Sequence, residues 1–140
     1  MSAIFFYGLF MDRALLVEEG VYPTVLGPAV LHDYRIHIGQ RATLLPTRGH
    51  RAYGIVMELT EDEAHDLYSE PTVREYVAAP VQVELLDTGE AIEADCYNLP
   101  GESGLAGTNP TYAAQLSRLA AALGLDTAYV EEIAGFTDDS

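Results

Sequence analysis

The chain of 140 residues carries 22 aspartates and glutamates against seven arginines and no lysine, which gives a formal net charge of −15. A charge of this size and sign repels phosphate backbones and anionic lipid heads, so no nucleic acid and no membrane partner is expected. The single cysteine, Cys96, excludes an internal disulfide, and the length suits one domain with a core of its own.

The predicted elements begin with a buried strand over residues 3–7, which is short, aromatic and stopped by Gly8. A short helix is predicted over residues 11–18. The segment 21–28 contains two prolines and a glycine and is predicted to be a loop or an edge segment. The N-terminal apolar run has no basic lead-in and is too short to cross a bilayer, so a cytoplasmic location is expected.

The middle of the chain is predicted to be rich in β-structure. Strands are predicted at residues 29–38, 43–45 and 53–59. A turn at residues 48–50 separates the last two strands. Thr60 and Glu63 form a capping box, because each side chain satisfies a backbone amide at the start of a helix. That helix is expected to reach Tyr68 or Ser69.

The C-terminal half is predicted to hold a hairpin and two helices. Residues 81–86 and 91–97 form the hairpin around a turn that contains Gly89. Asn109 followed by Pro110 is a typical helix start, and the apolar residues then recur at helical spacing. Asp126 caps a last short helix, and residues 137–140 are expected to form an acidic tail.

These elements amount to about six strands and four helices, and the strands do not alternate regularly with the helices. That order argues against a doubly wound parallel sheet. The predicted class is α+β, with a small mixed, mostly antiparallel β-barrel or strongly curved sheet and peripheral helices. Residues 1–136 would form this single domain.

The motifs that hold phosphates, zinc or calcium, or that form a nucleophile elbow, are absent from the sequence, so neither a cofactor nor a metal is expected. Cys96 is predicted to lie on the inner face of its strand beside Ala94, where a thiol is normally inert. A thiol enzyme using Cys96 remains a remote alternative that requires an exposed sulfur beside a histidine. The remaining chemistry is that of carboxylates and backbone amides.

Four arginines fall in a stretch without acidic residues, between Tyr34 and Met57. They are Arg35, Arg41, Arg48 and Arg51. They form either a local positive surface for an anionic group of a substrate, such as a carboxylate, or a set of ion pairs with acids elsewhere in the chain. The sequence alone leaves both interpretations open.

The order of several motifs is similar to one known family. Residues 5–11 (Phe-Phe-Tyr-Gly-Leu-Phe-Met) resemble a Tyr-Gly-(Ser/Thr)-(Leu/Asn)-(Met/Leu) signature that closes a first strand. Residues 29–36 are similar to the second strand of that family, and residues 52–59 to its glycine-containing strand. Tyr76 with residues 81–85, and Tyr112 with residues 123–129, continue the likeness. On these motifs the chain resembles the γ-glutamylcyclotransferase-like, or AIG2-like, family over almost its whole length.

The resemblance implies a pocket at one mouth of the barrel. In the family, backbone amides just after the Tyr-Gly pair hold the substrate. Carried over to this sequence, these residues are Gly8, Leu9, Phe10 and Met11. The resemblance also implies a catalytic base in the stretch 66–71, where Glu70 is the best candidate, and Glu75 and Glu58 are lesser ones. Tyr7, Tyr76 and Tyr112 would wall the pocket and offer hydroxyls to the carboxylate of the substrate.

The implied function is an enzyme that cyclises a small γ-glutamyl amine or peptide to 5-oxoproline and releases the amine. Its partner would be that small γ-glutamyl compound, and the apolar segments near both ends of the chain are compatible with a homodimer. Leu9 stands where the family often has a hydroxyl residue, and Pro71 stands where it has glycine. These two departures favour the alternative, a non-catalytic small-molecule-binding or interaction protein on the same fold.

Overall fold

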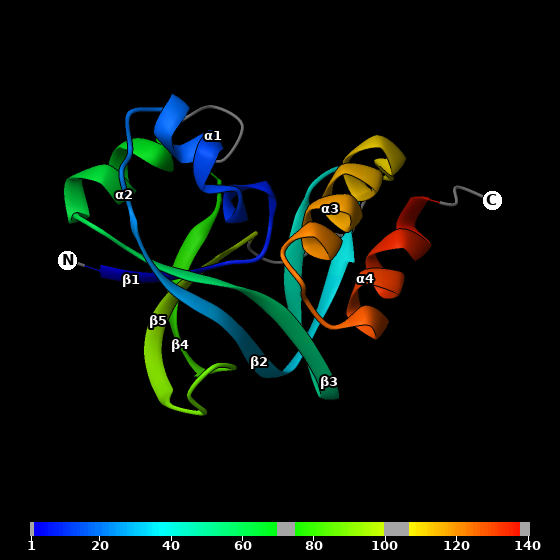
Figure 1. The fold of residues 1–140 in the computed structure, drawn as a ribbon. Helices are drawn as coiled ribbons and strands as arrows, with labels where there is room; N and C mark the ends of the chain where they lie inside the picture. The colour runs from blue at the N-terminus through cyan, green and yellow to red at the C-terminus, as the bar shows by residue number, and fades with distance from the viewer. Residues whose placement is uncertain (1, 70–74, 100–106, 138–140) are drawn as a thin grey trace.

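The computed structural model describes residues 2–69, 75–99 and 107–137 (Figure 1). The described strands are β1 (Ser2–Phe6), β2 (Thr24–Ile38), β3 (Ala42–Leu59), β4 (Val77–Leu85) and β5 (Ala91–Asn98). The described helices are α1 (Arg13–Glu18), α2 (Glu61–Leu67), α3 (Pro110–Ala122) and α4 (Thr127–Ala134), with short 3-10 turns η1 (Leu9–Met11) and η2 (Gly135–Thr137). The last residues of the predicted acidic tail, 138–140, lie outside the described part.

The strands close into a barrel in the order β1-β3-β2-β4-β5. Neighbouring strands run antiparallel except β1 and β5, which are parallel and meet at Ile4 and Asp95. Figure 1 shows α1 and α2 at one end of the barrel, with α3 and α4 side by side on its flank. The predicted α+β class, a small mixed and mostly antiparallel barrel with peripheral helices, is therefore confirmed.

Strand β2 is longer than the sequence predicts. The prediction for residues 21–28 was a loop or an edge segment. Residues 21–23 precede the strand, and β2 begins at Thr24 and continues through Pro28, which pairs with Ile55. Up to Pro28 the register partners of β2 lie in β3 alone, so this stretch is an edge segment and not a loop. A bulge between Val25 and Gly27 shifts the register, and Gly27 adopts a φ of 136° that favours glycine. Bulges are places where a strand tolerates proline and glycine, which explains the misleading signal.

Strand β3 also runs on where a turn was predicted. The strands predicted at 43–45 and 53–59 are parts of one strand, so the described residues form five strands and not six. Residues 47–50 bulge out opposite Asp33, since His32 pairs with Arg51 and Tyr34 with Pro46. The backbone of Asp33 has a φ of 66°, and its carboxylate accepts a hydrogen bond of 3.0 Å from the Gly49 amide.

The helix starts follow the predicted capping pattern. The Glu63 amide donates to the Thr60 hydroxyl at 3.1 Å, and the Thr60 amide donates to the Glu63 carboxylate at 3.0 Å. Asn109 accepts from the Tyr112 amide at 3.0 Å, with Pro110 at the first helical position. The helix predicted over residues 11–18 starts two residues later, at Arg13, because Met11 belongs to η1.

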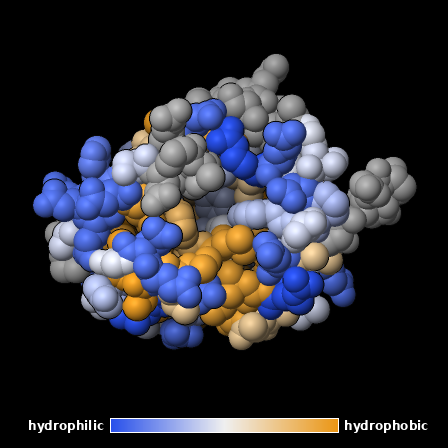
Figure 2. All heavy atoms as spheres, turned by 90° about the horizontal axis from the view of Figure 1, so that it is seen from above, coloured by the Kyte–Doolittle hydropathy of each residue, from blue (hydrophilic) through white to orange (hydrophobic). Residues whose placement is uncertain are grey.

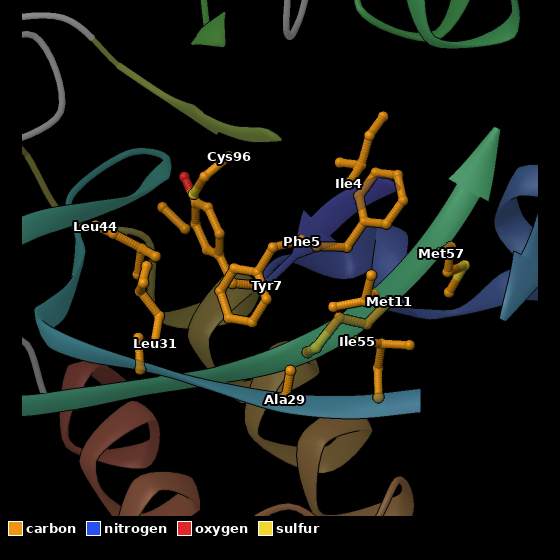
Figure 3. Close-up of a cluster of buried hydrophobic side chains, with 14 of the residues drawn as sticks. Ile4, Phe5, Tyr7, Met11, Ala29, Leu31, Leu44, Ile55, Met57 and Cys96 are labelled. Carbon is orange, nitrogen blue, oxygen red and sulfur yellow. The ribbon is translucent and has the colours of Figure 1, made fainter. Parts of the chain in front are cut away.

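The core fills the inside of the barrel and the space under the helices. Figure 3 shows Phe5, Tyr7, Met11, Ile55 and Cys96 within one buried cluster. The inward orientation predicted for Cys96 and Ala94 is confirmed, because both side chains are buried. Among the described residues, no helix is both long and apolar enough to span a membrane.

Close packing of β1 on β3 depends on glycine at position 54. A Cβ built on Gly54 would lie 2.2 Å from the Phe6 carbonyl oxygen and 3.0 Å from the Phe5 ring. We predict that Gly54→Ala destabilises the protein by about 3 kcal/mol, since the strands must separate to admit the methyl group. Urea denaturation measures the change in the free energy of unfolding.

The matched control is Gly135→Ala, because a Cβ at Gly135 meets nothing within 4 Å. This variant is expected to unfold at nearly the same urea concentration as the parent protein. Equal stability of the Gly54 and Gly135 variants would contradict the close contact between β1 and β3.

Candidate active site

A hollow of about 540 Å³ opens at the mouth of the barrel. Its lining comes from the end of β1, η1, α1, the turn between β2 and β3, the end of α2, the residue before β4, β5, and α3. Figure 2, which views the molecule from above, shows hydrophobic residues around a hollow in this face. A concave, mostly apolar cavity of this size is typical of a small-molecule site.

The turn after β1 forms one side of the hollow. Gly8 precedes η1, and the Met11 amide donates to the Gly8 carbonyl at 3.0 Å. Gly8, Leu9 and Phe10 line the hollow, whereas Met11 is only 2% exposed and packs in the core. The structure therefore brings three of the four predicted turn residues to the hollow, and places Met11 behind them with its amide already bonded.

Tyr112 reaches this turn from the first turn of α3. A Cβ built on Gly8 would lie 2.8 Å from the Tyr112 hydroxyl oxygen, so glycine is what lets the hydroxyl approach the turn. Burial raises the pKa of Tyr112, and a hydrogen bond from the Leu9 backbone opposes that rise. Since an amide can only donate, the Tyr112 hydroxyl accepts this bond and keeps its own proton for another acceptor.

The other two predicted tyrosines also line the hollow, but their hydroxyl protons are committed to the protein. The Tyr7 hydroxyl lies 2.7 Å from the Tyr97 carbonyl and 2.8 Å from the Asn98 side-chain oxygen, and both are acceptors. Burial raises the pKa of Tyr7 well above its usual range. The Tyr76 hydroxyl donates to the Ala42 carbonyl at 2.5 Å, and burial raises the pKa of Tyr76 to about 12.

An aromatic wall, which consists of Phe6, Phe10, Tyr68 and Tyr97, forms another side of the hollow. The rings of Phe6 and Phe10 meet edge to face with centroids 6.1 Å apart, and Phe10 meets Tyr68 in the same way at 5.9 Å. Tyr68 stacks on Tyr97 at 3.7 Å with an interplanar angle of 4°. Sequence reasoning missed this wall. The available signal was Tyr97, which follows the inward-facing Cys96 on β5 and so points out of the barrel, where an aromatic ring indicates a packing partner.

The four arginines do not act as one group. Arg41 lines the hollow, and its guanidinium lies 3.2 Å from the Glu75 carboxylate and 6.0 Å from the centre of the Tyr76 ring. Arg48 and Arg51 are exposed on β3, and no carboxylate of the described residues forms an ion pair with them. Arg35 is half-buried on β2 and, like Arg48 and Arg51, does not line the hollow. Of the four arginines, only Arg41 therefore fits the interpretation of a positive group near a ligand.

The predicted base, Glu70, lies outside the described residues, as does Pro71. Of the lesser candidates, Glu75 is exposed and paired with Arg41. Glu58 lies on β3 between the buried Met57 and Leu59, so its side chain points to the opposite face of the strand from theirs. No carboxylate among the described residues lines the hollow. Tyr68 and Tyr76, which each lie one residue further from the gap than its described neighbours Ser69 and Glu75, both line the hollow.

The thiol alternative was wrong. Cys96 is 0% exposed, and burial raises the pKa of its thiol to about 12. The Asn98 side-chain amide donates to the Cys96 sulfur at 3.5 Å, so the residue belongs to the packing of β5. Within the described part of the chain, no three histidine, cysteine, aspartate or glutamate side chains are grouped to hold a metal ion.

The described strands and helices thus form a closed barrel with a mostly apolar hollow at its mouth. The sequence profile described as gamma-glutamyl cyclotransferase, AIG2-like, matches residues 4–115, so the chain belongs to this family. No curated protein sequence matches the chain.

Solved structures share the fold at low sequence identity. A gamma-glutamyl cyclotransferase is 17% identical, with a TM-score of 0.76 over 99% of this chain and 90% of its own. An uncharacterized protein from Homo sapiens is 21% identical, with a TM-score of 0.74 over the same shares. YkqA from Bacillus subtilis is 22% identical, with a TM-score of 0.80, and the match covers 99% of this chain and 54% of YkqA.

The burial of Cys96 predicts slow chemistry at its sulfur. At pH 8 a thiol with a pKa of about 12 is almost fully protonated, and only the thiolate reacts. We expect the native protein to react with iodoacetamide at least about a hundredfold more slowly than the same protein in urea. Mass spectrometry follows the alkylation, and equal rates in the two states would show that the sulfur is accessible.

Proposed function

We propose that the protein is an enzyme that cyclises a small γ-glutamyl amine or peptide to 5-oxoproline and releases the amine. The observation that carries the proposal is the meeting of Gly8, Leu9 and the Tyr112 hydroxyl at the rim of an apolar hollow. Donor groups aimed into a cavity that excludes water are suited to stabilise a developing oxyanion. Membership of the family supports the same reaction class.

In the proposed reaction the nucleophile belongs to the substrate. Glu70 takes a proton from the α-ammonium group, and the freed amine attacks the γ-carbonyl carbon to close a five-membered ring. The Phe10 amide and the Tyr112 hydroxyl donate to the oxyanion. The bond from the γ-carbon to the leaving nitrogen then breaks as Glu70 gives its proton to that nitrogen. The ring nitrogen loses its second proton through Glu70 to the released amine, which departs as an ammonium ion. Because both reacting groups lie in one molecule, proximity supplies much of the rate.

The proposed base is supported by the path of the chain. Glu70 is the second residue after Tyr68, so their Cα atoms are at most about 7.6 Å apart. Tyr68 and Tyr76 both line the hollow, and the segment that carries Glu70 joins them. A carboxylate held beside such an apolar cavity would have a raised pKa, which suits a group that both takes and returns a proton.

A second candidate function is a non-catalytic small-molecule-binding or interaction protein. The observation that favours it is that no described residue lining the hollow is a carboxylate. Leu9 also provides no side-chain hydrogen bond at the position where the family often has a hydroxyl group. A protein of this kind would bind its ligand in the same hollow and release no 5-oxoproline.

The test is to incubate the protein with a panel of γ-glutamyl amines and dipeptides and to measure 5-oxoproline by chromatography. We expect turnover on at least one of them, and a fall in kcat of at least about a hundredfold for Glu70→Gln, since general base catalysis contributes that much. Retained activity in the Glu70 variant would remove this residue from the mechanism. Absence of turnover on the whole panel would favour the binding protein.

The matched control is Glu75→Gln, which removes a nearby exposed carboxylate and its ion pair with Arg41. Its effect on kcat is expected to stay within about threefold, because an exposed ion pair contributes little. If the Glu75 variant loses more activity than the Glu70 variant, the base is Glu75. Circular dichroism of both variants checks that they fold.

A further inference from the structure

We propose that the leaving amine of the substrate is uncharged beyond the reacting nitrogen and carries an aromatic or extended apolar group, which binds against the aromatic wall. This inference rests on the proposed cyclisation of a γ-glutamyl compound and names the half of the substrate that the reaction leaves open. Its arguments are the size of the hollow, the composition of its wall and the charge at its rim.

The hollow is larger than the reacting half of the substrate. A γ-glutamyl group fills only about half of the 540 Å³, even at the generous volume of roughly 30 Å³ for each non-hydrogen atom. The remaining space accommodates a group of the size of a benzyl or phenethyl substituent. A substrate with a very small amine would leave apolar side chains facing water.

The wall that borders this space is apolar. The Phe10 ring contacts the rings of Phe6 and Tyr68 edge to face, so the three rings form a continuous surface, and Leu15 of α1 lines the same hollow. The stack of Tyr68 on Tyr97 holds the ring of Tyr68 in place, so the surface is formed before the ligand arrives. A flat aromatic group gains both area burial and ring contacts on such a surface.

The charge at the rim disfavours a second cationic group. Arg41 is the one charged residue among the described residues that line the hollow, and its ion-pair partner, the exposed Glu75, lies outside the lining. An amine that carries an additional ammonium, as the side chain of lysine does on a peptide, would meet this guanidinium and no described carboxylate of the lining. A leaving amine whose substituent is a neutral aromatic group is not repelled by this guanidinium.

The test compares kcat/KM for three substrates that differ only in the amine. They are γ-glutamyl benzylamide, γ-glutamyl methylamide and a lysine derivative, the mono-γ-glutamyl amide of decarboxylated lysine (1,5-diaminopentane), which keeps one free ammonium and no carboxylate. We expect the benzylamide to exceed the methylamide by about a hundredfold, because even one methylene in an apolar pocket gives 10–200-fold. The lysine derivative is expected to fall below the benzylamide by a similar factor.

A pair of variants at Leu15 separates charge from lost apolar contact. Leu15 is half-buried on α1, so both variants are expected to fold. Leu15→Asn should lower kcat/KM for the benzylamide about tenfold without helping the lysine derivative. Leu15→Asp should lower kcat/KM for the benzylamide by a similar factor. It should raise kcat/KM for the lysine derivative about tenfold, because the new carboxylate attracts the ammonium of that substrate.

The outcomes distinguish this inference from the proposed function. Turnover of all three substrates at similar kcat/KM, or a preference for the lysine derivative in the parent protein, would overturn the apolar amine and leave the cyclisation standing. Absence of 5-oxoproline from all three, together with absence from the wider panel, would overturn the cyclisation itself and the inference with it.

Discussion

The hydrogen bonds of the Tyr7 hydroxyl join the barrel where the register of paired strand residues is shortest, between β1 and β5. β1 and β5 are the one parallel pair of neighbours and meet at Ile4 and Asp95, so strand pairing contributes little there. The Tyr7 hydroxyl, directly after β1, bonds the Tyr97 carbonyl and the Asn98 side chain at 2.7 and 2.8 Å. The Asn98 side-chain oxygen also accepts a hydrogen bond from the Leu44 amide at 3.0 Å. These bonds therefore link the end of β1 to β5 and β5 to β3.

This junction between β1 and β5 fixes the geometry of the hollow. Because Tyr7 is held, the chain turns at Gly8 directly at the mouth of the barrel, and the absence of a side chain at Gly8 admits the Tyr112 hydroxyl from α3. The three tyrosines expected to bind a carboxylate therefore differ in their hydrogen bonding. Tyr7 and Tyr76 secure backbone carbonyls, and Tyr112 alone has a proton left for a ligand.

Features that depend on neighbours in the sequence were predictable. The capping box at Thr60 and the cap at Asn109 use only residues three apart, so the sequence contains all the information they need. The long strands were not predictable, because Gly27, Pro28 and Gly49 normally signal turns and here lie in or directly beside bulges that long-range pairing stabilises. The residues of the Tyr-Gly turn could be identified from their motif, whereas the aromatic wall joins three distant segments that only the closed barrel brings together.

The central claim is that a γ-glutamyl compound binds in the hollow against the turn at Gly8. The most direct measurement is a titration of the isotope-labelled protein with glutaryl benzylamide, which lacks the α-amine and so cannot cyclise, followed by amide NMR. The account predicts saturable shifts of the Gly8, Leu9 and Phe10 amide signals, with those of the distant Gly89 turn unchanged. Saturable binding that leaves the Gly8 turn unshifted and moves signals elsewhere on the barrel would contradict it.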